Sequence, residues 1–105
     1  MNSKLYFDGV RLPVSAENAV AVMTDILTAL GCDGAASEFI ARHLADASLC
    51  GVESHGVMRI LQYARQFRSG YMSASGEARV TKRDGQFLTI DGDGGHGIPA
   101  MQLAF

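Results

Sequence analysis

The stretch that decides the fold reads Gly51-Val-Glu-Ser-His-Gly-Val-Met-Arg-Ile-Leu-Gln-Tyr63. A helix over 54–69, turning about 100° per residue, separates this part of the chain into two faces. The apolar face is made of Val57, Ile60, Leu61, Ala64 and Phe67. The polar face carries His55, Arg59, Gln62 and Gln66, with Tyr63 at its edge. The pattern therefore predicts an amphipathic helix whose apolar side enters a core.

The polar face of this helix also holds a candidate site. His55 and Arg59 are four residues apart, so a helix places both on one strip of surface, and Ser54 stands where an N-cap would stand. An imidazole can move a proton near neutral pH, and a guanidinium can grip a carboxylate. Ser54 and His55 are neighbours pointing about 100° apart on a helix, which disfavours a Ser–His nucleophile pair. The spacing is compatible with half of an active site or with a solvated helix face.

Two further helices are expected before this one, after an extended lead-in over 1–14. Ser15 caps a helix over 15–30, which Gly31 ends, and Asp33 caps another over 35–49. Each has an apolar stripe at helical spacing, so the three helices should pack together. His43 falls within the apolar face of the second of these helices, where a histidine is usually a hydrogen-bonded core residue.

The sequence changes character after residue 70. Strands are expected over 78–82 and 86–91, joined at Asp84-Gly85, and a glycine loop leads into a helix over 98–105. The fold class is therefore α+β: a three-helix segment, then a β-hairpin, a glycine loop and the start of a further helix. A lone hairpin is marginal in water and the last helix is apolar, which predicts the front part of a larger protein.

Composition limits the class of protein. The chain has 105 residues, 48% of them hydrophobic and 19% charged, which is typical of one globular domain. A net charge of −2 with scattered basic residues predicts no nucleic-acid or membrane-surface partner. No apolar run is long enough to cross a bilayer, and the start lacks a signal-peptide core, so the expected location is cytoplasmic. Cys32 and Cys50 are expected to be buried thiols.

The spacing of residues bears on two kinds of ligand site, a dinucleotide site and a metal site. Gly92-Asp-Gly-Gly-His-Gly97 matches the dinucleotide pattern G-x-G-x-x-G, but Asp91 and Asp93 add negative charge and the preceding strand belongs to a hairpin. A flexible turn with positive φ angles, leaving His96 exposed, is the favoured interpretation. No metal site is predicted, because no zinc-ligand spacing joins the candidate ligands Cys32, His43, Cys50, His55 and His96.

Several motifs taken together resemble one enzyme family. They are Ser54-His55-Gly56 followed by Arg59 and Tyr63, the preceding Ala-Asp-Ala-Ser-Leu-Cys-Gly segment, and the Asp-Gly-Asp-Gly-Gly-His-Gly loop. This combination resembles the malate/L-lactate dehydrogenase family, the type-2 group without a Rossmann fold, which includes ureidoglycolate and sulfolactate dehydrogenases. Members are much longer chains, so the resemblance is to their N-terminal portion and implies the front of a larger α/β dehydrogenase.

The resemblance implies hydride transfer between NAD or NADP and a 2-hydroxy or 2-oxo acid. It implies that His55 is catalytic, as proton donor or as positioning residue, and that Ser54, Arg59 and Tyr63 bind substrate. Residues 1–105 would form the helical, substrate-side portion, with the nucleotide-binding domain outside this chain. The isolated chain would then be inactive, and the full-length protein a homodimer. The alternative is a non-enzymatic helical module that docks a protein partner.

Overall fold

The computed structural model describes residue 9 and residues 11–105, so most of the expected lead-in lies outside the described residues. The first two helices form where they were predicted. Helix α1 spans Ala16–Ala29, and the Ser15 side chain accepts a hydrogen bond from the Asn18 amide. Helix α2 spans Gly34–Leu49, and Asp33 accepts one from the Ala36 amide. Both side chains satisfy amides that a helix start leaves without partners, which is why both helices begin here.

The third helix begins later than predicted. Residues Glu53–His55 form a single 3₁₀ turn, η1, and helix α3 spans Arg59–Ser69. Gly56 separates the two because its backbone is extended (φ −102°, ψ −147°). Ser54 is therefore not an N-cap of α3, and no side chain caps that helix. At the other end, Gly70 adopts φ +81° and terminates α3 as expected.

The core lies among the three helices, as the apolar stripes predicted. Its buried residues come mainly from α1 and α2, with a smaller share from α3: Val20, Met23, Leu27, Ile40, Ala41, Leu44, Ala45, Ile60 and Phe67. Leu61 was assigned to the apolar face but is 64% exposed, because α3 turns its Ile60 and Phe67 side inward. None of the described helices has the length and apolar character that a membrane span needs.

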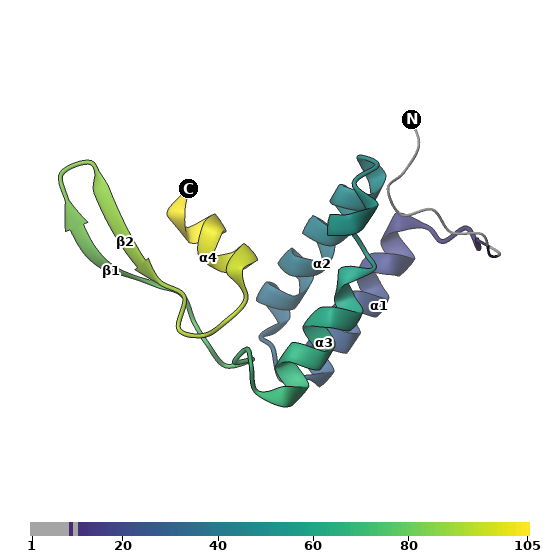
Figure 1. Cartoon of the computed structure of the whole chain (residues 1–105), viewed down its shortest axis with the longest axis horizontal. Coiled ribbons are helices and arrows are strands. Elements are labelled where there is room, and N and C mark those ends of the chain that lie inside the picture. Colours follow the sequence, from purple (N-terminus) through teal and green to yellow (C-terminus); the bar gives the residue numbers. More distant parts are fainter. Residues whose placement is uncertain (1–8, 10) are drawn as a thin grey trace.

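The second half of the chain leaves the helical bundle. Strands β1, Arg79–Asp84, and β2, Phe87–Asp91, pair in antiparallel fashion, with an irregular register between Val80 and Lys82. Helix α4 spans Gly97–Ala104. Figure 1 shows the hairpin projecting away from the α1–α2–α3 bundle, with α4 between the hairpin and α2. The observed architecture is the α+β arrangement that the sequence predicted.

The glycine loop is fixed to the segment that precedes the hairpin. The Ser73 amide donates to the Gly94 carbonyl over 2.7 Å, and the Glu77 amide donates to the Asp93 carboxylate over 3.1 Å. Gly76 lies so close that a Cβ there would stand 2.5 Å from the Asp93 carbonyl oxygen. Asp93 and Gly94 have positive φ angles, as expected of a turn. The loop is therefore anchored to the segment that precedes the hairpin.

Two side-chain predictions also need correction. His43 was expected in the core but is exposed, because α2 packs through Ile40 and Leu44 and turns His43 outward. Cys32 is a buried thiol as expected, and burial raises its pKa. Cys50 is exposed, since it follows the last turn of α2 at the edge of the bundle.

Candidate functional site

The connection between α2 and α3 carries the predicted catalytic residue. It leaves α2 through Gly51, which has φ +84°, and the Val52 amide donates back to the Ala47 carbonyl. Further along, the Val57 amide donates to the Ser48 hydroxyl over 2.9 Å. These bonds hold both ends of the connection against the last turn of α2. The side chains of η1 therefore stand on a fixed backbone.

Ser54 contacts both functional groups that the sequence singled out. Its hydroxyl lies 2.9 Å from the Nδ1 atom of His55, and its carbonyl oxygen accepts a hydrogen bond of 2.6 Å from the Nε of Arg59. Helix geometry disfavoured a contact between Ser54 and His55, but the contact forms because η1 is not part of α3 and Ser54 folds onto the neighbouring ring. A hydroxyl can donate or accept, so it satisfies Nδ1 in either tautomer of His55.

The two charged or titratable groups remain accessible. His55 is exposed, and its Nε2 is the ring nitrogen not engaged by Ser54. Arg59 is half-buried, and its Nη1 donates to the Gln62 side chain. Each terminal nitrogen of a guanidinium carries two N–H groups, so Nη1 keeps a second donor beside those of Nη2. That end of Arg59 can hold a carboxylate in the two-bond geometry that planar guanidinium groups favour.

Tyr63 lies one turn beyond Arg59 on α3, and its ring contacts His96. Its half-buried ring meets the ring of His96 edge-on, with centroids 4.2 Å apart and planes at 89°. His96 also lies over Phe67, with centroids 6.4 Å apart and planes at 25°. Aromatic pairs in these geometries contribute about 0.5–1.5 kcal/mol beyond burial. The prediction that His96 is exposed is wrong, because the anchored loop presses its ring against α3.

His96 is also the N-cap of α4. Its Nδ1 accepts a hydrogen bond of 3.1 Å from the Ile98 amide. The sequence offered a signal for this, since His96 directly precedes a helix start marked by Gly97 and Pro99, but histidine is an uncommon cap. Burial, with a smaller contribution from the charge of His43, lowers the pKa of His96 to about 4. The ring is therefore neutral at physiological pH.

We expect this titration to make stability depend on pH. The unfolded chain takes up the His96 proton as the pH falls through about 6.5, whereas the folded chain takes it up only near pH 4. Acidification across that window therefore favours the unfolded chain, and the Tm should fall. In His96→Phe, which keeps a ring but cannot titrate, Tm measured by circular dichroism should fall less steeply. Equal slopes in both proteins would show that His96 is not the group responsible.

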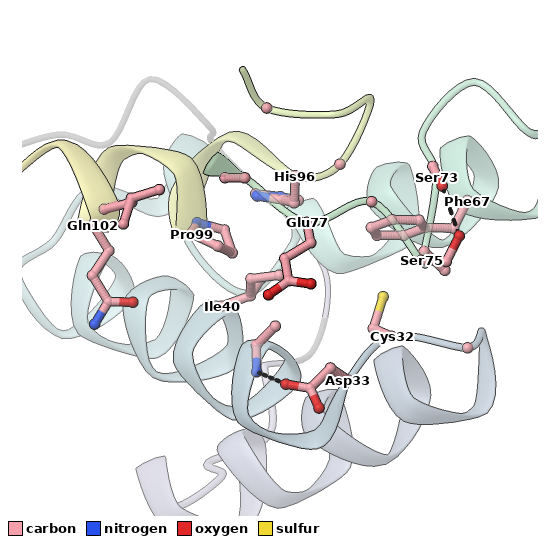
Figure 2. Close-up of a pocket in the computed structure, with 18 residues that line it drawn as sticks. Cys32, Asp33, Ile40, Phe67, Ser73, Ser75, Glu77, His96, Pro99 and Gln102 are labelled. Carbon is pink, nitrogen blue, oxygen red and sulfur yellow. Dashed lines mark hydrogen bonds between the residues drawn. The ribbon is translucent and has the colours of Figure 1, made fainter. Parts of the chain in front are cut away.

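A cleft of about 800 Å³ lies beside this contact. Figure 2 shows Asp33 and Ile40 of the α2 side facing His96 and Pro99 across it. The lining includes none of the four predicted site residues. The cluster of Ser54, His55 and Arg59 therefore lies outside the cleft. His96 lines the cleft and also contacts Tyr63 on α3.

A family model for malate/L-lactate dehydrogenase matches residues 14–105. The chain belongs to this family. Among the relatives of the malate/L-lactate dehydrogenase family, the malate dehydrogenase of Pyrococcus horikoshii is 33% identical over 97 residues, which cover 92% of this chain and 27% of that protein. The L-sulfolactate dehydrogenase of Methanothermobacter thermautotrophicus is 33% identical over 95 residues, 87% of this chain and 28% of that protein.

Solved structures of malate/L-lactate dehydrogenase relatives share this fold. The structure of malate dehydrogenase from Pyrococcus horikoshii superposes with a TM-score of 0.84 at 31% identity, covering 98% of this chain and 30% of that one. Sulfolactate dehydrogenase from Methanocaldococcus jannaschii gives 0.79 at 29% identity, covering 85% and 27%. The chain therefore spans less than a third of the length of these relatives.

In this chain of the malate/L-lactate dehydrogenase family, the glycine loop does not fit the pyrophosphate of a dinucleotide cofactor. The amide of Gly95 donates to the Gly92 carbonyl, and the amide of Asp93 donates to the Asp91 carboxylate. Those donors are already used within the loop, and the two carboxylates would repel phosphate. The loop also follows an antiparallel hairpin and not the βαβ unit that dinucleotide binding uses. Within residue 9 and residues 11–105, no metal-binding cluster is found either.

Proposed function

We propose that this chain forms the substrate-side portion of a dehydrogenase that reduces a 2-oxo acid to a 2-hydroxy acid with NADH or NADPH. The observation that carries the proposal is Ser54, whose hydroxyl meets His55 and whose carbonyl oxygen binds Arg59. Relatives named as malate and sulfolactate dehydrogenases support the class of reaction. The name of the (2R)-3-sulfolactate relative from Chromohalobacter salexigens specifies NADP(+). As part of the proposal, the full-length enzyme is a cytoplasmic homodimer.

His55 and Arg59 supply complementary chemistry in this proposal. When the carbonyl carbon of the acid receives a hydride, its oxygen must receive a proton. The doubly protonated ring of His55 donates that proton from Nε2 and becomes neutral, with its remaining proton on Nδ1, where it is donated to the Ser54 hydroxyl. The free end of Arg59 binds the substrate carboxylate, which fixes the reacting carbon relative to His55. Tyr63, one turn along α3, adds a hydrogen bond to the acid.

The cofactor would be held mainly by parts of the protein outside this chain. Hydride transfer needs the donor and acceptor carbons a few ångströms apart, so residues that grip only the acid should give almost none of the rate. We therefore propose that the 105-residue chain alone is not a working dehydrogenase.

The experiment compares the 105-residue chain with the longest polypeptide that its gene encodes. Oxidation of NADH and NADPH should be followed with the 2-oxo acids that correspond to malate, lactate and sulfolactate. We expect turnover of at least one acid by the longest polypeptide and none by the short chain. Absence of turnover from a longest polypeptide that circular dichroism shows to be folded would favour the interaction module. Turnover by the short chain would mean that a cofactor site exists within it.

A further inference from the structure

The His96 imidazole makes two kinds of contact with two different helices. Its Nδ1 accepts a hydrogen bond from the Ile98 amide at the start of α4. Its ring contacts Tyr63 and Phe67, which are four residues apart on α3. The loop behind the ring is fixed, because the Gly94 carbonyl accepts from Ser73 and Gly95 packs against Gly76. A ring held in this way is a rigid wall for whatever lies against it.

The proton on His96 has a defined place in this arrangement. A neutral imidazole has one donor and one acceptor nitrogen, and Nδ1 is the acceptor. The proton is therefore on Nε2, which is fully buried and has no hydrogen-bond partner among the described residues. A charged ring could not accept from Ile98, so the cap and the ring contact persist together only in the neutral form.

Tyr63 is the residue whose position this ring decides. Tyr63 is half-buried and packs against the helical core, and tyrosine side chains in general have several staggered rotamers. The edge-on contact at 4.2 Å blocks those that would swing the phenol into the space occupied by His96. Tyr63 is one turn from Arg59, so its rotamer determines where the hydroxyl stands relative to the guanidinium.

We propose that His96 is a positioning residue, which fixes the Tyr63 ring on α3 while the same imidazole caps α4. The inference rests on the proposed substrate-binding role of Tyr63. It adds a residue from the glycine loop to the substrate side of the site and gives that loop a function without a phosphate ligand. The cap needs an acceptor atom and the contact needs a planar ring. An imidazole supplies both in one side chain.

Two substitutions separate these duties. His96→Asn keeps a side-chain acceptor for the Ile98 amide and removes the ring. His96→Phe keeps the ring and removes the acceptor. Nuclear magnetic resonance of the 105-residue chain provides the first measurement. Wild type should show the Nε2–H tautomer and a nuclear Overhauser effect between the two rings. The Tyr63 ring resonances should shift in His96→Asn and stay near wild type in His96→Phe.

The second measurement uses the longest polypeptide and a double-mutant cycle. His96→Asn should raise KM for the 2-oxo acid by roughly three- to tenfold with kcat within about twofold, because only substrate binding through Tyr63 changes. In a Tyr63→Phe background, which has no phenol hydroxyl to position, the same change should have little further effect. His96→Phe should keep KM within about twofold of wild type.

The outcomes distinguish this inference from the proposed function. Unshifted Tyr63 resonances in His96→Asn, or effects on KM that multiply in the double variant, would overturn the inference while leaving the dehydrogenase intact. If His96→Asn does not fold, His96→Phe decides, since loss of the Tyr63 ring position there contradicts the inference. If no variant or wild type turns over an acid, the proposed function fails, and the resonance shifts still show whether His96 fixes Tyr63.

Discussion

Replacing His55 with alanine in the longest polypeptide should lower kcat/KM for the 2-oxo acid by roughly 10²-fold or more. The substitution removes the imidazole that Ser54 holds and with it the group that we propose transfers the proton. The loss should appear mainly in kcat, because the group that we propose binds the carboxylate, Arg59, remains. Steady-state kinetics over a range of pH provides the measurement.

His43→Ala is the matched control for this experiment. His43 is also an exposed histidine on the helical bundle, and it takes part in neither the proton transfer nor the acid binding that we propose. Its replacement should leave kcat/KM within about twofold. Near-normal turnover of His55→Ala at every pH would rule out proton transfer by His55 and leave it at most a positioning role.

Replacing Gly56 with alanine should destabilise the chain by roughly 2 kcal/mol, or about 10 °C in Tm. A Cβ at this position would overlap the Ser48 hydroxyl and stand 3.1 Å from the Cβ and amide nitrogen of the same residue. Ser48 must then move, and the Val57 amide loses its acceptor in a half-buried place. Because the displaced backbone carries η1, activity in the longest polypeptide should fall as well. Thermal unfolding and steady-state kinetics measure the two effects.

Gly34→Ala tests whether the cost comes from the close contact and not from loss of glycine as such. Gly34 is the first residue of α2, has no positive φ, and would place its new Cβ with nothing within 4 Å. An alanine there should be neutral or stabilise the chain by about 0.4–1 kcal/mol, since it restricts the unfolded chain. A Tm for Gly56→Ala that equals the wild-type value would show that Ser48 gives way without loss.

The sequence predicted the parts of this fold that depend on local pattern. The side chains of Ser15 and Asp33 cap the helices that follow them, and the stripes of α1 and α2 form the core. Helical periodicity continued across Gly56, however, and predicted one helix over 54–69. What breaks that helix is the contact with Ser48, eight residues earlier, and periodicity along one segment does not report such contacts.

The same limit applies to the candidate site. Sequence spacing placed His55 and Arg59 together, and the structure brings them together through Ser54, by a route that the helix hypothesis did not contain. His96 was missed because its burial depends on a loop that folds onto the segment around Gly76. Tertiary contacts of this kind follow from the packed chain and not from the motif that contains the residue.

The bonds that fix the α2–α3 connection also decide which helix His55 follows. Val52 and Val57 are both tied to the last turn of α2, through the Ala47 carbonyl and the Ser48 hydroxyl. The turn η1 is therefore attached to the end of α2 and should move with it, whereas Tyr63 is part of α3 and moves with that helix. A sliding of α2 against α3 would therefore change the separation between His55 and Tyr63, and it would act on the hydrogen bond from Arg59 to the Ser54 carbonyl, which joins η1 to α3. If His55 and Tyr63 act on an acid as we propose, variation in the packing between these two helices would change the length of acid that fits between them.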